Sequence, residues 1–255
     1  MNKQWKKFDP SALSFSGTAA DLMNKQWKKF DHLTETCYSD IARGVSDINN
    51  WNTCFTLLLE IISDGREANP DFAKELYLLD DETDYCHDVQ GWLEDYLDEL
   101  DMREMYPELE SACRKLLTLF EWKEEYPSEI RFLLASALGN QGKPEEALKY
   151  CENWEADETG NPLAAAALIY AKIKMKDLEG AEEVVKRYIA EDTVCTEEND
   201  VIFTAALRLY KENGNKEMEK KMDDILEEYD KKLGEYLTGL GEEDLEFIDD
   251  EMPFN

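Results

Sequence analysis

Residues 133–154 read LLASALGNQGKPEEALKYCENW, in which two apolar stretches with helical spacing flank a turn that contains Gly142. Ala135 lies in the first stretch and Ala147 in the second, 12 residues later. Small side chains at facing positions allow two helices to approach each other closely. This stretch therefore predicts a pair of packed helices joined by a short turn.

The small residue and the breaker of this pair recur along the chain. Ala112, Ala147 and Ala181 are spaced by 35 and 34 residues, and Pro127 and Pro162 by 35. Periods of this size indicate repeated supersecondary units. Because a single helix pair cannot bury its apolar face without a neighbour, we expect the pairs to stack into an all-α superhelix with a concave surface.

The unit at 128–161 resembles the tetratricopeptide repeat (TPR). In that family a small residue of the first helix meets a small residue of the second, and a proline closes the unit. The matching positions are two small residues, one turn residue and two large residues of the first helix: Ala135, Ala147, Gly142, Leu134 and Leu138. The resemblance implies a right-handed superhelix of antiparallel helix pairs, a TPR-like α-solenoid, that binds a protein or peptide without catalysis.

The following units depart from the family pattern. In the unit from Pro162 to about Cys195, Ile169 stands where the first small residue belongs. In the unit at about 197–230, Glu219 replaces the alanine of the second helix. The resemblance covers roughly residues 100–230.

Apolar periodicity and breakers predict further helices and a division into four segments. The predicted helices are at about 33–45, 50–63, 71–79, 84–101, 107–123 and 215–238, with breakers at Asp64-Gly65, Asn69-Pro70, Pro107 and Pro127. The predicted segments are a basic segment and linker at 1–22, a helical region at 23–126, repeats with a C-terminal helix at 127–240, and an acidic tail at 241–255.

The resemblance also predicts which residues face the groove. They are Glu129, Phe132, Ser136 and Asn140 in the first unit, and Ala164, Ala167, Ala171 and Lys174 in the second. An exposed Phe132 would anchor a peptide, since aromatic side chains carry much of the binding energy at interfaces. The alternative is that Phe132 packs against the preceding helix pair.

The formal net charge is −31, from 59 acidic and 28 basic residues. Such a surface repels phosphate backbones, which argues against direct nucleic-acid binding, and it attracts basic proteins or peptides.

An acidic band at 80–110 holds 13 acidic residues and one basic residue. The band is either a solvated face, a docking surface for a basic partner, or a mimic of nucleic-acid phosphates that blocks a nucleic-acid-binding protein. Its candidate residues are Asp88, Asp95, Asp98 and Glu99.

The residue patterns point to no catalytic, cofactor or metal site. His87 follows Cys86 directly, and neighbouring helix residues do not face each other. The stretch DDETDYCHDVQG at 80–91 has oxygen ligands at alternate positions, as calcium loops do, but Tyr85 and Gly91 replace the required glycine and glutamate. We interpret it as an acidic helix start that complements the helix dipole.

The six cysteines occur singly, none in a CxxC motif. Each falls in an apolar helical pattern, so we expect reduced cysteines that pack as small buried hydrophobic groups. The sequence shows neither a signal peptide nor an apolar run long enough to cross a membrane. Together these features predict a cytoplasmic protein.

The nonamer MNKQWKKFD occurs twice, at residues 1–9 and 23–31. Three explanations fit. The first is a second gene start joined through a linker to a native start at Met23. The second is a functional duplicate that docks in the groove of its own chain or exchanges with a neighbour, which would cause self-association. The third is a remnant of recombination. In each case the second copy should begin the first helix, because Pro10 ends the first copy.

The last 17 residues read GLGEEDLEFIDDEMPFN and should be disordered when free. They resemble the acidic C-terminal tip of bacterial single-stranded DNA-binding proteins, which recruits other proteins. The matching residues are Asp249, Asp250, Met252, Pro253 and Phe254. In that family phenylalanine is the last residue, whereas Asn255 follows here. The alternatives are a general acidic–aromatic binding motif and a solubilising tail.

Overall fold

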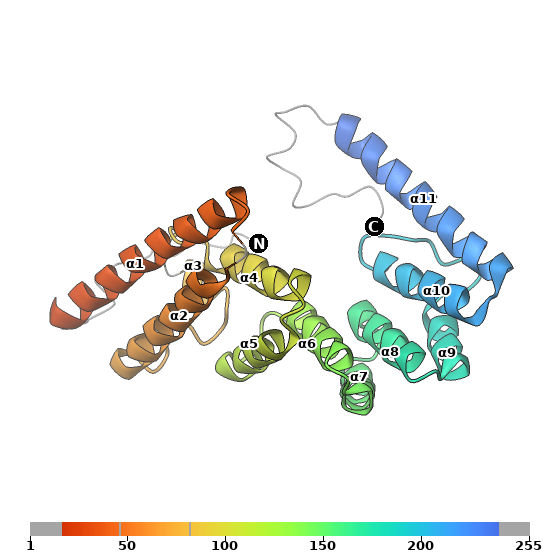
Figure 1. Cartoon of the computed structure of the whole chain (residues 1–255), viewed down its shortest axis with the longest axis horizontal. Helices are drawn as coiled ribbons and strands as arrows, with labels where there is room; N and C mark the ends of the chain where they lie inside the picture. The colour runs from red at the N-terminus through yellow and green to blue at the C-terminus, as the bar shows by residue number, and fades with distance from the viewer. Residues whose placement is uncertain (1–16, 46, 82, 240–255) are drawn as a thin grey trace, which may run out of the picture. The chain divides into compact units, whose positions relative to one another are not determined.

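The computed structural model describes residues 17–45, 47–81 and 83–239, which fold into 11 helices and contain no strand (Figure 1). The helices pack in consecutive pairs, as expected for the predicted all-α solenoid of helix pairs. They form two compact units. One holds the described residues up to Glu99 together with Thr118–Tyr126, and the other holds Leu100–Leu117 and the described residues from Pro127 onward.

The N-terminal unit is built around stacked aromatic rings. Its helices are α1 (Gly17–Ala42), α2 (Asn49–Ala68), α3 (Leu78–Asp81) and most of α4 (Val89–Met102). The α1 helix packs against α2. Trp92 of α4 stacks on Trp51 of α2 at 5.7 Å between ring centroids, and on Tyr96 at 5.5 Å. Both tryptophans are fully buried, so large apolar surfaces hold α4 to α2.

The predicted helix at 71–79 is wrong, because only the short α3 helix forms there. Ala73 has a positive φ of 43°, which is incompatible with a right-handed helix. The guanidinium of Arg66 satisfies the backbone instead, donating to the carbonyls of Phe72 at 3.2 Å and Ala73 at 2.7 Å. An arginine from a neighbouring helix thus replaces helical hydrogen bonds.

The predicted break at Asp64-Gly65 is also wrong, since α2 continues to Ala68. Gly65 is buried, and a Cβ there would collide with the ring of Phe72. The glycine is therefore required for close packing of Phe72 on α2 and does not mark a turn.

Two further boundaries differ from prediction. The α1 helix begins at Gly17, so residues 17–22 of the predicted linker are helical. The helix predicted at 107–123 ends at Leu119 as α5 (Tyr106–Leu119). Beyond it, the backbone N–H of Lys123 donates to the buried carboxylate of Glu75 at 3.0 Å. This bond holds the segment after α5 to the N-terminal unit.

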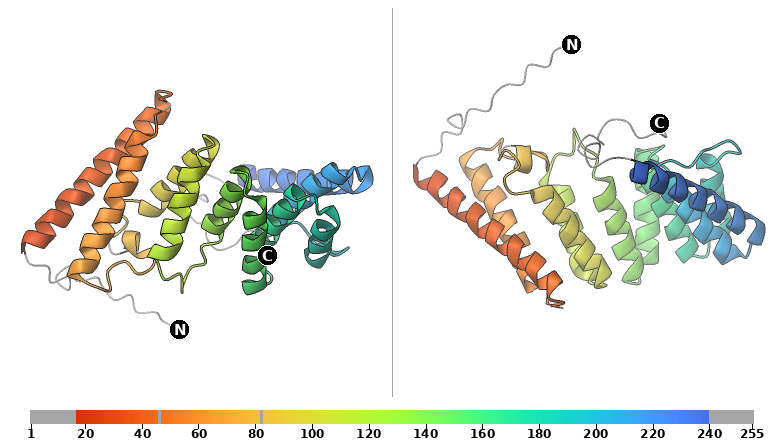
Figure 2. Two further views of the ribbon diagram at one scale, coloured as in Figure 1. Left: turned by 60° about the horizontal axis from the view of Figure 1, so that its bottom comes forward. Right: turned by 90° about the horizontal axis from the view of Figure 1, so that it is seen from above.

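The C-terminal unit contains most of α5 and three successive helix pairs (Figure 2). The pairs are α6 (Ser128–Asn140) with α7 (Pro144–Asp157), α8 (Pro162–Lys174) with α9 (Leu178–Tyr188), and α10 (Asp200–Asn213) with α11 (Lys216–Gly239). The first two pairs coincide with the units predicted from the repeat spacing, whereas the third extends past the predicted end at about 230 to Gly239. The two small residues that define the first pair, Ala135 and Ala147, are both buried.

The α8 helix lies in the middle of this stack, where it contacts α6, α7, α9 and α10. It buries apolar side chains on every side, including four consecutive alanines at 164–167. Its start is fixed by Asn161, whose side-chain oxygen accepts the N–H of Leu163 at 3.0 Å and that of Ala164 at 3.3 Å. Small side chains permit this four-sided contact, because larger ones would separate the neighbouring helices.

In each of the three pairs, one residue of the turn has a left-handed backbone conformation with a positive φ. Gly142 has φ of 76° and Gly214 has φ of 74°, as glycine readily allows. The second pair has Lys176 at this position, with φ of 63°. A lysine here is strained relative to glycine, and such strain is often found at functional sites.

Candidate functional site

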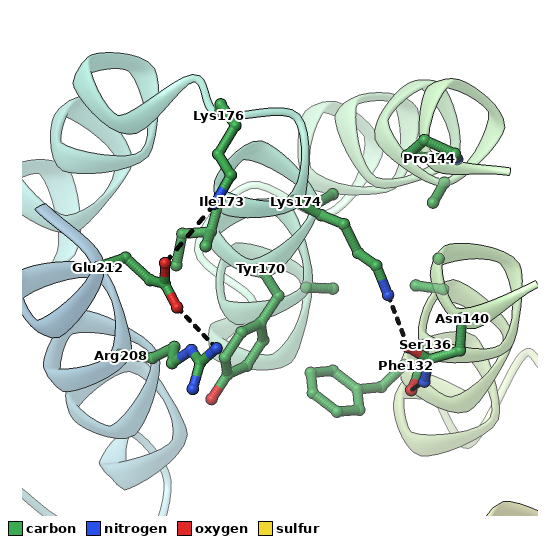
Figure 3. Close-up of a pocket in the computed structure, with 15 residues that line it drawn as sticks. Phe132, Ser136, Asn140, Pro144, Tyr170, Ile173, Lys174, Lys176, Arg208 and Glu212 are labelled. Carbon is green, nitrogen blue, oxygen red and sulfur yellow. Dashed lines mark hydrogen bonds and ion pairs between the residues drawn. The ribbon is translucent and has the colours of Figure 1, made fainter. Parts of the chain in front are cut away.

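A pocket of about 670 Å³ opens in the C-terminal unit (Figure 3). Its walls come mainly from the first helices of the three pairs, α6, α8 and α10. This volume falls in the range of pockets that bind small ligands or peptide side chains. The pocket therefore lies where the concave surface of stacked helix pairs is expected.

Small residues form the hollow. Ala135 and Gly139 of α6 and Ala167 and Ala171 of α8 line the pocket. At Gly139 the nearest atom to an added Cβ would be Cδ of Lys174, at 3.6 Å. The absence of large side chains at these positions leaves space between α6 and α8.

Two aromatic rings lie together at the pocket (Figure 3). Phe132 of α6 and Tyr170 of α8 meet edge to face, with 6.3 Å between ring centroids and 76° between planes. Both side chains are half-buried. Burial raises the pKa of Tyr170, and nearby Arg208 acts in the opposite direction. Phe132 thus packs towards the following helix pair, and it presents the apolar part of the pocket together with Tyr170.

Four charged side chains line the pocket: Lys174, Lys176, Arg208 and Glu212. Nη2 of Arg208 lies 2.7 Å from one oxygen of Glu212, and Nζ of Lys176 lies 3.6 Å from the other. Nζ of Lys174 donates to the neutral side-chain oxygen of Asn140 at 2.7 Å. Among the described residues, Lys174 has no carboxylate partner within 4.0 Å. The pocket is locally cationic in a strongly acidic chain.

Most of the predicted groove residues lie in this pocket. Phe132, Ser136, Asn140 and Lys174 line it, as do the predicted Ala167 and Ala171. Glu129 is exposed on α6 outside the pocket, and Ala164 is fully buried in the core.

Several pocket residues escaped the sequence-based prediction, although the repeat spacing contains a signal for them. Asn140, Lys174 and Arg208 follow one another at intervals of 34 residues, so they occupy equivalent positions in the three pairs. Tyr170 follows Ser136 by the same interval, and Lys176 follows Gly142. Extending the period into the third pair would have found Arg208.

Three of the four residues predicted for the acidic band are exposed: Asp88, Asp95 and Asp98. Asp95 also accepts the hydroxyl of Tyr38 at 2.7 Å. Glu99 is buried, so its placement on a solvated docking face is wrong. Although the residue is exposed, partial burial of its carboxyl raises the pKa of Asp98, and the nearby Asp95 and Glu99 add to this effect.

The acidic stretch at 80–91 contains a helix cap. One carboxylate oxygen of Asp80 accepts the N–H of Val89 at 2.6 Å, and the other accepts the N–H of Gln90 at 2.9 Å. These are the first two residues of α4, whose N–H groups have no helical partners. Within the described ranges, no cluster of three or more potential ligand side chains is arranged to hold a metal ion.

The side chain of His87 is held by contacts with α1 in the N-terminal unit. It is half-buried, stacks on Trp27 at 4.4 Å and 3°, and places Nδ1 2.6 Å from Oδ1 of Asp31. Its neighbour Cys86 is exposed in a loop, so the prediction that every cysteine is buried in a helix is wrong at this position. The other five cysteines are buried, but Cys195 lies in the connection between α9 and α10, so the predicted helix is wrong at that position too.

The first nonamer and the tail motif from Asp249 to Phe254 lie outside the described residues. Among the residues that the structure does describe, no helix is both long enough and apolar enough to cross a membrane.

Comparison with known proteins gives a family match over part of the chain. Residues 140–197 match the family model of the tetratricopeptide repeat. This match covers the second helix of the first pair, the whole second pair and the connection to the third. No curated protein and no solved structure gives a significant match.

Proposed function

We propose that this TPR-like helical repeat protein is a non-catalytic adaptor that binds a peptide segment of another protein in the pocket of α6, α8 and α10. The observation that carries the proposal is the combination, in one concave pocket, of two apolar rings and a lysine that has no carboxylate partner among residues 17–45, 47–81 and 83–239. Stacked helix pairs commonly use such concave surfaces for binding.

The pocket chemistry indicates the character of the bound segment. An apolar side chain would pack on Phe132 and Tyr170, and a carboxylate would displace Asn140 from Lys174. Arg208 and Lys176 share Glu212, so three cations face one carboxylate. These charges favour an acidic or neutral segment with an apolar anchor.

The net charge of −31 predicts a basic partner for the chain as a whole, whereas the three cations of the pocket favour an acidic or neutral segment at that site. A cytoplasmic location also stays a prediction from cysteine usage. The nucleic-acid mimic is the less favoured alternative, because Glu99, one of its four candidate residues, is buried.

The proposal is tested by selecting ligands from an unbiased peptide library on the full-length protein. We expect selected peptides to combine an aliphatic or aromatic residue with a nearby carboxylate. Lys174→Ala should weaken their binding roughly tenfold or more, because a charge-assisted hydrogen bond is lost. Ser136→Tyr should block the pocket without changing a core position, since Ser136 is half-buried at its edge.

Lys149→Ala is the matched control, because Lys149 is an exposed lysine on α7 outside the pocket. Binding is measured by fluorescence polarisation and folding by circular dichroism. Peptides that bind Lys174→Ala and Ser136→Tyr as tightly as the unchanged protein would contradict the proposal.

A further inference from the structure

The second nonamer, Met23–Asp31, supplies two aromatic rings to the core of the N-terminal unit. Trp27 is 6% exposed and stacks on His87. Phe30 is fully buried and meets the edge of Trp92, with 5.4 Å between ring centroids and 76° between planes. These two rings fix α1 against the elements that follow α2.

Polar contacts fix the same nonamer at two further points. Nε2 of Gln26 donates to Oδ2 of Asp64 at 2.7 Å, and Asp31 pairs with His87 at 2.6 Å. The backbone carbonyl of Phe30 also lies 3.9 Å from the thiol sulfur of Cys54. We call the receiving residues, Cys54, Asp64, His87 and Trp92, the nonamer-binding site.

The first nonamer carries every side chain that this site recognises. Gln4, Trp5, Phe8 and Asp9 are identical to Gln26, Trp27, Phe30 and Asp31, in the same spacing. The lysines of the second copy, at 25, 28 and 29, are exposed, so their counterparts at 3, 6 and 7 would also face solvent. The site therefore has no side-chain contact that distinguishes the two copies.

We propose that the nonamer-binding site accepts Met1–Asp9 in place of Met23–Asp31 of the same chain. The 22 residues from Pro10 to Asp31 would then leave the core as a loop whose ends meet where Asp9 adjoins His32. Residues 32–42 keep their place on α2, because their contacts do not depend on which copy precedes them. This site is separate from the pocket of the C-terminal unit, and the inference is independent of the proposed function.

Connectivity gives the second copy its advantage. Residues 23–31 continue directly into the rest of α1, whereas Pro10 interrupts any helix that begins in the first copy. Closing a loop of this length disfavours the exchange by roughly 100-fold. The first copy therefore occupies the site only when substitutions weaken the binding of the second copy.

The same chain is favoured over a second molecule as the source. The first copy is joined to the second by residues 10–22 of the same chain, and a segment tethered over so short a stretch has an effective concentration on the order of millimolar. A second molecule at micromolar concentration competes poorly with it. Exchange within one chain also leaves the protein monomeric, which separates it from domain swapping.

The test compares four full-length proteins by urea unfolding, followed by tryptophan fluorescence and circular dichroism. They are the unchanged chain, Trp27→Ala/Phe30→Ala, the matched control Trp5→Ala/Phe8→Ala, and the protein with all four substitutions. The control should match the unchanged chain. Trp27→Ala/Phe30→Ala should raise the unfolding constant of the N-terminal unit by about 100-fold, the loop-closure factor.

All four substitutions together should raise that constant by about 10⁴-fold or more, because two buried aromatic side chains are lost with no replacement. Equal loss of stability in the Trp27→Ala/Phe30→Ala protein and in the fourfold variant would overturn the proposal, as would both proteins being unfolded without urea. If the stability of the Trp27→Ala/Phe30→Ala protein rose with protein concentration and sedimentation showed a dimer, the assignment to the same chain would be overturned.

Discussion

At the scale of single residues, Glu110 joins α5 to the first repeat pair. It accepts hydrogen bonds from Nζ of Lys143 at 2.7 Å, Nε2 of Gln141 at 2.8 Å and Nε of Arg114 at 2.8 Å. Burial raises the pKa of Glu110, but these donors outweigh it and lower the pKa to about 2. Its side chain is 15% exposed, so solvent screens the interactions only weakly.

Because the pKa of Glu110 is lower in the folded state than its ordinary 4.5, its stabilisation is complete above pH 4.5 and is lost as the pH falls towards 2. We expect Glu110→Gln to lower the free energy of unfolding by up to about 3 kcal/mol at pH 7. The exposed Glu108→Gln on the same helix is the control. Urea unfolding at pH 7 and pH 3 checks this. A deficit of equal size at both pH values would rule out the charge as its cause.

The cysteines differ sharply in exposure. Burial raises the pKa of Cys37 and Cys195 to about 11 and that of Cys113 and Cys151 to about 12. Cys86 alone is exposed among the six.

We therefore expect iodoacetamide to modify the folded protein once, at Cys86, at pH 7.5, and all six thiols in urea, because alkylation requires an accessible thiolate. Intact-mass and peptide mass spectrometry measure this. A Cys86→Ser protein that still takes up one adduct at the original rate would show that a second thiol is accessible.

At the scale of elements, α4 begins where a distant carboxylate caps it. Asp80 lies in α3, nine residues before Val89, and its two oxygens bind consecutive N–H groups of α4. The residues between them include Asp84 and Tyr85, both with positive φ. The cap therefore orders a strained loop as well as the start of a helix.

Asp80→Ala should lower the free energy of unfolding by about 2 kcal/mol, since it leaves buried N–H groups of α4 without a partner. Asp81→Ala, at the exposed neighbouring position of α3, should change it by less than about 0.5 kcal/mol. Urea unfolding followed by tryptophan fluorescence compares the two variants. Similar losses for both would mean that the cap contributes little.

At the scale of the whole molecule, the repeats were predictable because their packing is local and periodic. Ala112, Ala147 and Ala181 recur at intervals of 35 and 34 residues, and all three are buried. The irregular segment at 71–79 was not predictable in this way. Its apolar pattern is helical, and only the carbonyl contacts of Arg66, from another element, show why no helix forms.

The candidate site was predictable to the same extent. Phe132, Ser136, Asn140 and Lys174 follow from the repeat positions, and Arg208 follows from the same 34-residue interval carried one unit further. The pairing of Arg208 and Lys176 through Glu212 depends on how α8 and α10 meet in space. Glu99 was misplaced because charge alone does not show which face of a helix is buried.

The alanines of α8 have a consequence for how ligand preference changes during evolution. These side chains set the distance between the first and third pairs, because α8 touches both α6 and α10. A substitution at one of them, outside the pocket, would move both walls while every residue that a ligand touches stays the same. Substitutions at buried alanines of α8 outside the pocket can therefore change which ligands the pocket prefers, although these alanines touch no ligand.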